Sequence, residues 1–107
     1  METVTPQQAL EMVQSGSAYG VDVREIEEWD LGHFEMFTLN PLSTFDSDIL
    51  PTDKPIIFIC RSGKRSGTAC DAVEPSGRKV FNLEGGMLAW QNVGLPMSAK
   101  HGTPQIS

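Results

Sequence analysis

The sequence predicts an α/β fold with a mainly parallel sheet, and three observations lead to that prediction. Short apolar runs alternate along the chain with segments whose apolar residues recur at helical spacing, which is typical of strands alternating with helices. The run at 56–60, IIFIC, is apolar throughout, as expected of a strand covered on both faces. A length of 107 residues fits a single domain.

The first half of the chain starts with a helix signal. Thr5 can cap a helix, Pro6 suits its first position, and Gln8 completes a capping box. Further along, one apolar run ends in Asp22, and a second contains Pro41, which lacks the N–H of a ladder hydrogen bond. The elements predicted here are a helix from Pro6 to about Gly16, a strand at 18–23, a short helix at 24–30, a strand at 37–42 and a connection at 46–55.

The second half contains the clearest strand of the sequence, at 56–60, which is rich in β-branched and aromatic residues and is opened by Pro55. Pro75 and Gly77 end the helix that follows it. We expect residues 1–97 to form the domain and residues 98–107 to form a loosely ordered C-terminal tail. The remaining predicted elements are a helix at 66–73, a strand at 79–83 and a helix at 85–94.

Composition excludes several functional classes. A formal net charge of −6 argues against general binding to nucleic acid or to an anionic membrane. No apolar stretch approaches the roughly 18 residues of a membrane span, and the start METVTPQQ lacks the features of a signal peptide. Two cysteines are too few for a disulfide scaffold, and without CxxC no zinc site is expected. The sequence therefore predicts a cytoplasmic protein that needs no metal or organic cofactor.

A basic loop in this acidic chain directly follows the clearest strand, in the stretch CRSGKRSG at 60–67. Cys60 stands at the carboxyl end of that strand, the end where parallel α/β sheets place their ligands. Backbone N–H groups of the turn and of the next helix would point toward the sulfur and favour an anion. Arg61, Lys64 and Arg65 add positive charge. The pattern indicates a site for a sulfur anion.

Such a site would activate the thiol, because the thiolate is the nucleophile. A cysteine with an ordinary pKa of about 8.5 is only about 3% ionised at pH 7, and lowering the pKa by about two units makes the thiolate dominant. The alternative is that Cys60 is a small apolar core residue, the usual fate of a free cysteine. That alternative leaves the glycines, serines and cations of the loop unexplained. Cys70 has no such loop and is interpreted as a core residue, with a resolving thiol as its alternative.

The spacing of the loop separates two thiolate chemistries. Cysteine-dependent phosphatases have the pattern C-x5-R, whose loop is wide enough for a phosphoryl group. Here Arg65 is the fifth residue after Cys60, which gives C-x4-R. The tighter loop suits one additional sulfur atom better than a tetrahedral phosphate.

Three motifs together resemble the single-domain rhodanese family of sulfurtransferases. They are DVREIEEWDLGHF at 22–34, CRSGKRS at 60–66 and NLEGGMLAWQNVGLPM at 82–97. They occur in the order of the family and at about its spacing, and the resemblance extends over 5–97. It implies a central, mostly parallel five-stranded sheet with helices on both faces.

The resemblance also implies an activity, the transfer of a sulfane sulfur from a donor such as thiosulfate to a thiophilic acceptor such as cyanide or a thiol. Cys60 would be the nucleophile and would carry the sulfur as a persulfide. The cations of the loop would attract the anionic donor, and its N–H groups would hold the persulfide. The implied substrate-binding residues are Arg61, Ser62, Gly63, Lys64, Arg65 and Ser66.

Residues outside the loop are given supporting roles. Asp22 and Arg24 match the D-V-R of the family and are interpreted as supports near the loop, with an ordinary ion pair as the alternative. His33 is interpreted as structural rather than catalytic. Two other functions stay open at this stage. One is a non-enzymatic carrier that delivers persulfide sulfur to a protein partner, and the other is a small phosphatase or arsenate reductase.

Overall fold

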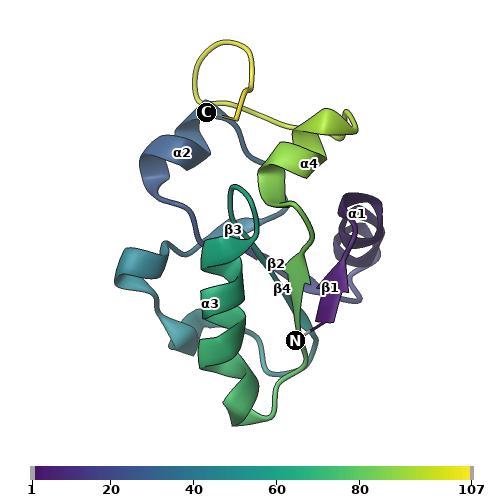
Figure 1. The fold of residues 1–107 in the computed structure, drawn as a ribbon, viewed down its shortest axis with the longest axis vertical. Helices are drawn as coiled ribbons and strands as arrows, with labels where there is room; N and C mark the ends of the chain where they lie inside the picture. Colours follow the sequence, from purple (N-terminus) through teal and green to yellow (C-terminus); the bar gives the residue numbers. More distant parts are fainter. Residues whose placement is uncertain (1, 107) are drawn as a thin grey trace.

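The computed structural model describes residues 2–106, and within them a five-stranded sheet forms the centre of the molecule (Figure 1). All neighbouring strands run parallel, in the order β1-β5-β4-β2-β3. The predicted α/β class with a mainly parallel sheet is therefore confirmed. The strands are β1 (Glu2–Val4), β2 (Tyr19–Asp22), β3 (Thr38–Leu39), β4 (Ile56–Ile59) and β5 (Val80–Leu83).

Helices and short 3₁₀ turns connect the strands. The capping box at the first helix is formed as predicted, because Thr5 and Gln8 each accept a backbone hydrogen bond from the other. The helices are α1 (Pro6–Gln14), α2 (Ile26–Leu31), α3 (Lys64–Val73) and α4 (Gly86–Asn92), and the 3₁₀ turns are Leu42–Thr44, Ser47–Ile49 and Glu74–Ser76.

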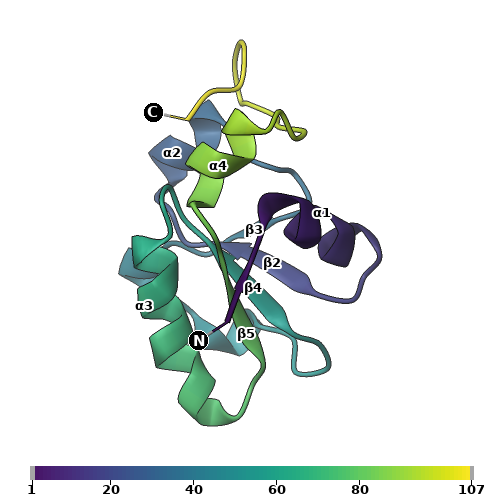
Figure 2. The ribbon, with the colours of Figure 1, turned by 45° about the vertical axis from the view of Figure 1, so that its right-hand side comes forward.

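The sheet separates two apolar clusters. Figure 2 shows α1 and α3 on opposite sides of the strands. Strand β4 supplies both clusters, since alternate side chains of a strand point to opposite faces. Ile57 and Ile59 pack on the α1 and α4 face with the fully buried Trp90, whereas Phe58 and Cys60 belong to the α3 face. The strand is apolar throughout because both of its faces are covered, as the sequence predicted.

Two strands differ from their prediction. Strand β1 was not predicted from its residues, because three residues with one buried apolar side chain give no recognisable period. The strand predicted at 37–42 contains only Thr38 and Leu39. Beyond Leu39 the backbone N–H groups of Asn40 and Leu42 still donate to the carbonyls of Asp22 and Val23, but Pro41 between them has no N–H to donate.

The C-terminal segment runs beside α2 and α4, as the yellow part of Figure 1 shows. Ser98 exchanges two backbone hydrogen bonds with His33, and Gln105 donates one to the carbonyl of Leu31. The loosely ordered tail expected at 98–107, whose last residue lies outside the described range, stays a prediction. Among residues 2–106, no helix combines the length and the apolar character that crossing a bilayer requires.

Candidate active site

Cys60 directly follows β4, at the carboxyl end of the parallel sheet, with β2 and β5 as the neighbours of that strand. The chain then turns sharply and enters α3 at Lys64. The turn depends on Gly63, whose φ of +106° lies in the left-handed region that side chains with a Cβ rarely adopt. This turn brings the first N–H groups of the helix back toward the end of the strand.

The sulfur of Cys60 faces the loop. The N–H of Gly63 donates to Sγ at 3.0 Å, and the hydroxyl of Ser66 lies 3.2 Å from it. Cys60 is only 1% exposed and packs in the apolar cluster of the α3 face. The two environments oppose each other, because an apolar surrounding disfavours a thiolate and hydrogen-bond donors favour it.

The hydrogen-bond donors affect the pKa of Cys60 more strongly than burial does. Burial raises the pKa of the Cys60 thiol, but the hydroxyl of Ser66 and the N–H groups of Ser66, Gly63 and Ser62 lower it by more. The pKa of Cys60 therefore lies below the usual value for a thiol. Cys70 shows the opposite behaviour, because burial and the nearby carboxylates of Asp71 and Glu74 raise its pKa to about 12. Only the cysteine in the loop has an environment suited to a thiolate nucleophile.

The three cations of the loop have different surroundings. Arg65 forms a two-pronged ion pair with Glu28 of α2, with N–O distances of 2.7 and 2.8 Å. Its charge is therefore largely balanced by a carboxylate. Arg61 and Lys64 have exposed side chains.

Glu28 gives a pH-dependent prediction. Its hydrogen bonds to Arg65 are the largest cause that lowers its pKa from 4.5 to about 2. The pair thus stabilises the fold fully above about pH 4.5, and this contribution is lost as the pH falls toward 2. The side chains of Arg65 and Glu28 are 36% and 23% exposed, so solvent screening reduces the expected cost of Glu28→Gln to about 1 kcal/mol near pH 6. Melting temperatures of both proteins between pH 6 and pH 2.5 should converge in acid.

The exposed pair of Lys79 and Glu2, with side chains 54% and 60% exposed, supplies the control for this experiment. Glu2→Gln should change the melting temperature little at any pH. A difference between wild type and Glu28→Gln that stayed constant down to pH 2.5 would contradict the assignment.

Asp22 and Arg24 form a buried ion pair below the loop. Their side chains are 0% and 1% exposed, and Arg24 Nη2 lies 2.8 Å from Asp22 Oδ2. The same guanidinium donates to the carbonyl of Gly32 at 2.8 Å, which ties the end of β2 to the end of α2. Its charge also helps to lower the pKa of Glu28. The two residues thus hold α2, and with it the partner of Arg65, in place.

Asn82 and Gly86 lie outside the loop and also contact it, and neither was predicted to belong to the site. Asn82 of β5 donates from Nδ2 to the carbonyl of Gly63 at 2.9 Å and accepts from the hydroxyl of Ser66 at 2.5 Å. A polar residue within the apolar run VFNL was the available signal. Gly86, at φ +60°, allows α4 to approach the loop, since a Cβ there would lie 2.5 Å from the carbonyl oxygen of Cys60.

His33 has a structural environment. Its ring stacks on Trp29 with a centroid distance of 4.0 Å, and Nδ1 lies 2.7 Å from the carbonyl of Trp29. Its backbone pairs with Ser98. These contacts agree with the interpretation of His33 as a structural residue.

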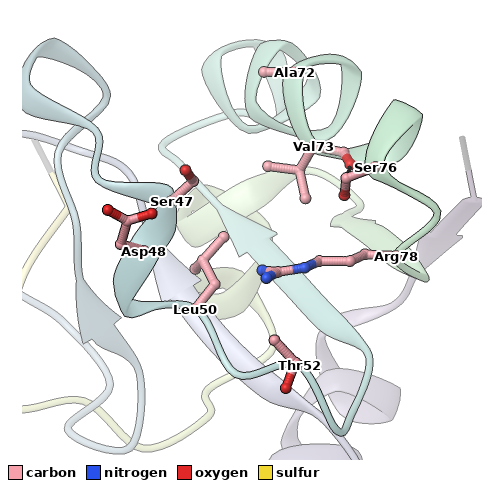
Figure 3. A pocket seen from close by; sticks show the side chains of 8 residues that line it. All are labelled: Ser47, Asp48, Leu50, Thr52, Ala72, Val73, Ser76 and Arg78. Atoms are coloured by element: carbon pink, nitrogen blue, oxygen red, sulfur yellow. Dashed lines mark hydrogen bonds between the residues drawn. The ribbon is translucent and has the colours of Figure 1, made fainter.

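A pocket of about 290 Å³ opens at the other end of α3 (Figure 3). Because it contains no residue of the 60–66 loop, it is separate from the thiol site. It is lined by Ser47, Asp48, Leu50, Thr52, Ala72, Val73, Ser76 and Arg78.

The arrangement described above can be compared with known proteins. The family profile described as Rhodanese-like domain matches residues 5–93. The chain belongs to the rhodanese-like domain family. The match spans the Asp22–Arg24 pair, the loop at 60–66 and the start of α4, so the resemblance inferred from the three motifs is confirmed.

Individual relatives of this chain include proteins named as sulfurtransferases. The chain is 40% identical over 80 residues to the putative sulfurtransferase YtwF of Bacillus subtilis, a match that covers 68% of this chain and 73% of the relative. It is 31% identical over 106 residues to the thiosulfate sulfurtransferase GlpE of Actinobacillus succinogenes, covering 96% of each chain. These relatives support sulfur transfer of the rhodanese type.

Two other relatives are much longer than this chain. It is 34% identical over 94 residues to the probable adenylyltransferase/sulfurtransferase MoeZ of two Mycobacterium tuberculosis strains, but that match spans only 24% of their length.

The fold of this rhodanese-like domain is also found in solved structures. A rhodanese-related protein from Thermoplasma volcanium superimposes with a TM-score of 0.83 at 26% identity, covering 92% of this chain and 98% of the other. The central parallel sheet with helices on both faces is therefore a rhodanese-like fold, as the resemblance implied.

Proposed function

We propose that this protein is a thiosulfate sulfurtransferase that works through a persulfide on Cys60. The observation that carries the proposal is the position of the Cys60 sulfur, held by the N–H of Gly63 and the hydroxyl of Ser66 at the head of a basic loop. The pKa of this thiol, lowered by its hydrogen-bond donors, supports the role of nucleophile. The similarity to GlpE, which is named a thiosulfate sulfurtransferase, supports the choice of donor.

The reaction takes two displacements. The Cys60 thiolate attacks the outer sulfur of thiosulfate, a new S–S bond forms, and the old one breaks with its electron pair leaving on sulfite. Cyanide or a thiolate then attacks the terminal sulfur of the persulfide, and the electron pair of that S–S bond returns to Cys60. With cyanide the product is thiocyanate. Atoms and charges balance without a metal or an organic cofactor.

The loop residues attract the anionic donor and stabilise the negatively charged sulfur. The exposed side chains of Arg61 and Lys64 attract the dianionic donor, and Arg65 adds to the positive field although Glu28 balances most of its charge. The N–H groups of Ser62, Gly63 and Ser66 stabilise sulfur that carries negative charge, as an oxyanion hole does for oxygen. Asp22 and Arg24 act indirectly, by holding α2.

The intact mass of the protein tests the proposal. Incubation with thiosulfate is expected to add one sulfur, about 32 Da, and cyanide is expected to remove it. A protein that gains no mass, although its thiol is reduced at the start, would contradict the function.

Two further assays, sulfur transfer to a protein thiol and hydrolysis of an aryl phosphate, distinguish the two alternatives. A loaded protein that ignores cyanide but passes its sulfur to a protein thiol would be a carrier. Hydrolysis of an aryl phosphate that depends on Cys60 would indicate a phosphatase, which the C-x4-R spacing disfavours. The cytoplasm is the compartment we propose, because Cys60 and Cys70 are both free thiols.

A further inference from the structure

The hydroxyl of Ser66 lies between two acceptors. Its Oγ is 3.2 Å from the sulfur of Cys60 and 2.5 Å from Oδ1 of Asn82. A hydroxyl carries one proton and can donate it to only one of them at a time. Cys60, Ser66 and Asn82 are 1%, 0% and 7% exposed, so water is a poor substitute for a missing partner here.

The orientation of the Asn82 amide is fixed by its second contact. Nδ2 donates to the carbonyl of Gly63 at 2.9 Å. A flipped amide would place Oδ1 against that carbonyl and would leave two acceptors facing each other. Oδ1 therefore points at Ser66 and requires a donor from it.

The contacts have different consequences for the two states of Cys60. In the neutral state, the thiol can donate to Ser66 Oγ while Ser66 donates to Asn82, so each acceptor is satisfied. In the thiolate state, the sulfur needs the proton of Ser66. If Ser66 donates this proton to the sulfur, Oδ1 of Asn82 is left buried without a donor. If Ser66 instead donates it to Asn82, the lone pairs of Ser66 face a negatively charged sulfur. Asn82 thus favours the neutral thiol in either arrangement.

We propose that Asn82 is a positioning residue that competes with the Cys60 thiolate for the single proton of Ser66 and so limits how readily the thiol ionises. The proposal rests on the proposed function only in treating Cys60 as the reacting group. Such a limit has a chemical use, because a thiolate of very low basicity is a weaker nucleophile. After sulfur transfer the negative charge lies on the terminal sulfur, and the proton of Ser66 can return to Asn82.

The charged groups around the sulfur come from several elements and stay unchanged when Asn82 is replaced. A difference between variants at position 82 therefore reports on the contact with Ser66 and on the amide itself. These groups are Arg61, Lys64 and Arg65 of the loop and α3, Glu28 of α2, Asp22 at the end of β2, Arg24 after β2, and Glu84 after β5.

The test is a double-mutant cycle of Asn82→Leu and Ser66→Ala, made in a Cys70→Ser background. The pH dependence of alkylation by iodoacetamide gives the pKa of Cys60 in each of the four proteins. With Ser66 present, Asn82→Leu should lower this pKa by about 0.5 to 1 unit, which raises the alkylation rate below the pKa about three- to tenfold. With Ser66→Ala, the same substitution should change it by less than about 0.2 units.

The cycle separates competition for the proton from structural support. Loss of the hydrogen bond to Gly63 would act equally in both backgrounds, so equal shifts would overturn the proposal. An unchanged or raised pKa for Asn82→Leu with Ser66 present would overturn it as well. If Asn82→Leu does not fold, Asn82→Ala removes the same acceptor without adding bulk and carries the comparison. Because alkylation needs no sulfur donor, the result is independent of whether thiosulfate loads the protein.

Discussion

Replacing Cys60 with serine is expected to abolish both the gain of one sulfur from thiosulfate and the release of thiocyanate with cyanide. A hydroxyl at this position is not ionised at neutral pH and cannot form a persulfide. The N–H groups of the loop would stay in place, so binding of the anionic donor alone should produce no stable mass gain. The intact mass after removal of free thiosulfate measures the effect.

Cys70→Ser is the matched control, because Cys70 is the other cysteine of the chain. It is 0% exposed and its pKa is raised to about 12, so it should take no part in loading. The variant is expected to gain the sulfur as wild type does, with some loss of stability from a polar group in the core. Loading of Cys60→Ser, or a folded Cys70→Ser that fails to load, would contradict the assignment.

Arg24→Met should destabilise the fold by about 3 to 5 kcal/mol, because it leaves the carboxylate of Asp22 buried without its partner. Asp22 is 0% exposed, and all three of its hydrogen bonds from the Arg24 side chain would be lost. For a domain with a typical total stability of about 5 to 15 kcal/mol, this is a large fraction. The urea midpoint, with the slope of the transition checked, measures it.

Two further variants give this prediction its controls. Removing both charges in Asp22→Leu/Arg24→Met should restore part of the stability, since no unpaired charge is then buried. Lys79→Met breaks the exposed pair with Glu2 and should cost less than about 1 kcal/mol. A cost of 1 kcal/mol or less for Arg24→Met would show that solvent reaches Asp22.

The parts of the site that the sequence predicted are local in the chain. Gly63 and Ser66 reach the sulfur from three and six residues away, so the order of residues after Cys60 was enough to infer donors around it. The turn itself could be inferred because glycine between polar residues is a turn signal. Asp22 and Arg24 lie two residues apart, and their pairing with charges was expected.

The contacts that sequence reasoning missed join distant segments. Glu28 meets Arg65 across 37 residues, and Ser66 meets Asn82 across 16. Both depend on the strand order β5-β4-β2, which hydrophobic periodicity does not supply. The charge of Arg65 was therefore assigned to the donor alone, whereas Glu28 balances most of it.

Side chains of β4 alternate between the two faces of the sheet, and this alternation determines on which face the Cys60 thiol lies. Ile56, Phe58 and Cys60 share one side of the sheet because they are separated by even numbers of residues. Inserting or deleting a single residue between Ile56 and Cys60 would change that parity and rotate the sulfur to the opposite layer, under α1 and α4. The number of residues from Ile56 to Cys60 is therefore constrained in evolution. A one-residue insertion or deletion there would separate the nucleophile from its hydrogen-bond donors even if every loop residue were preserved.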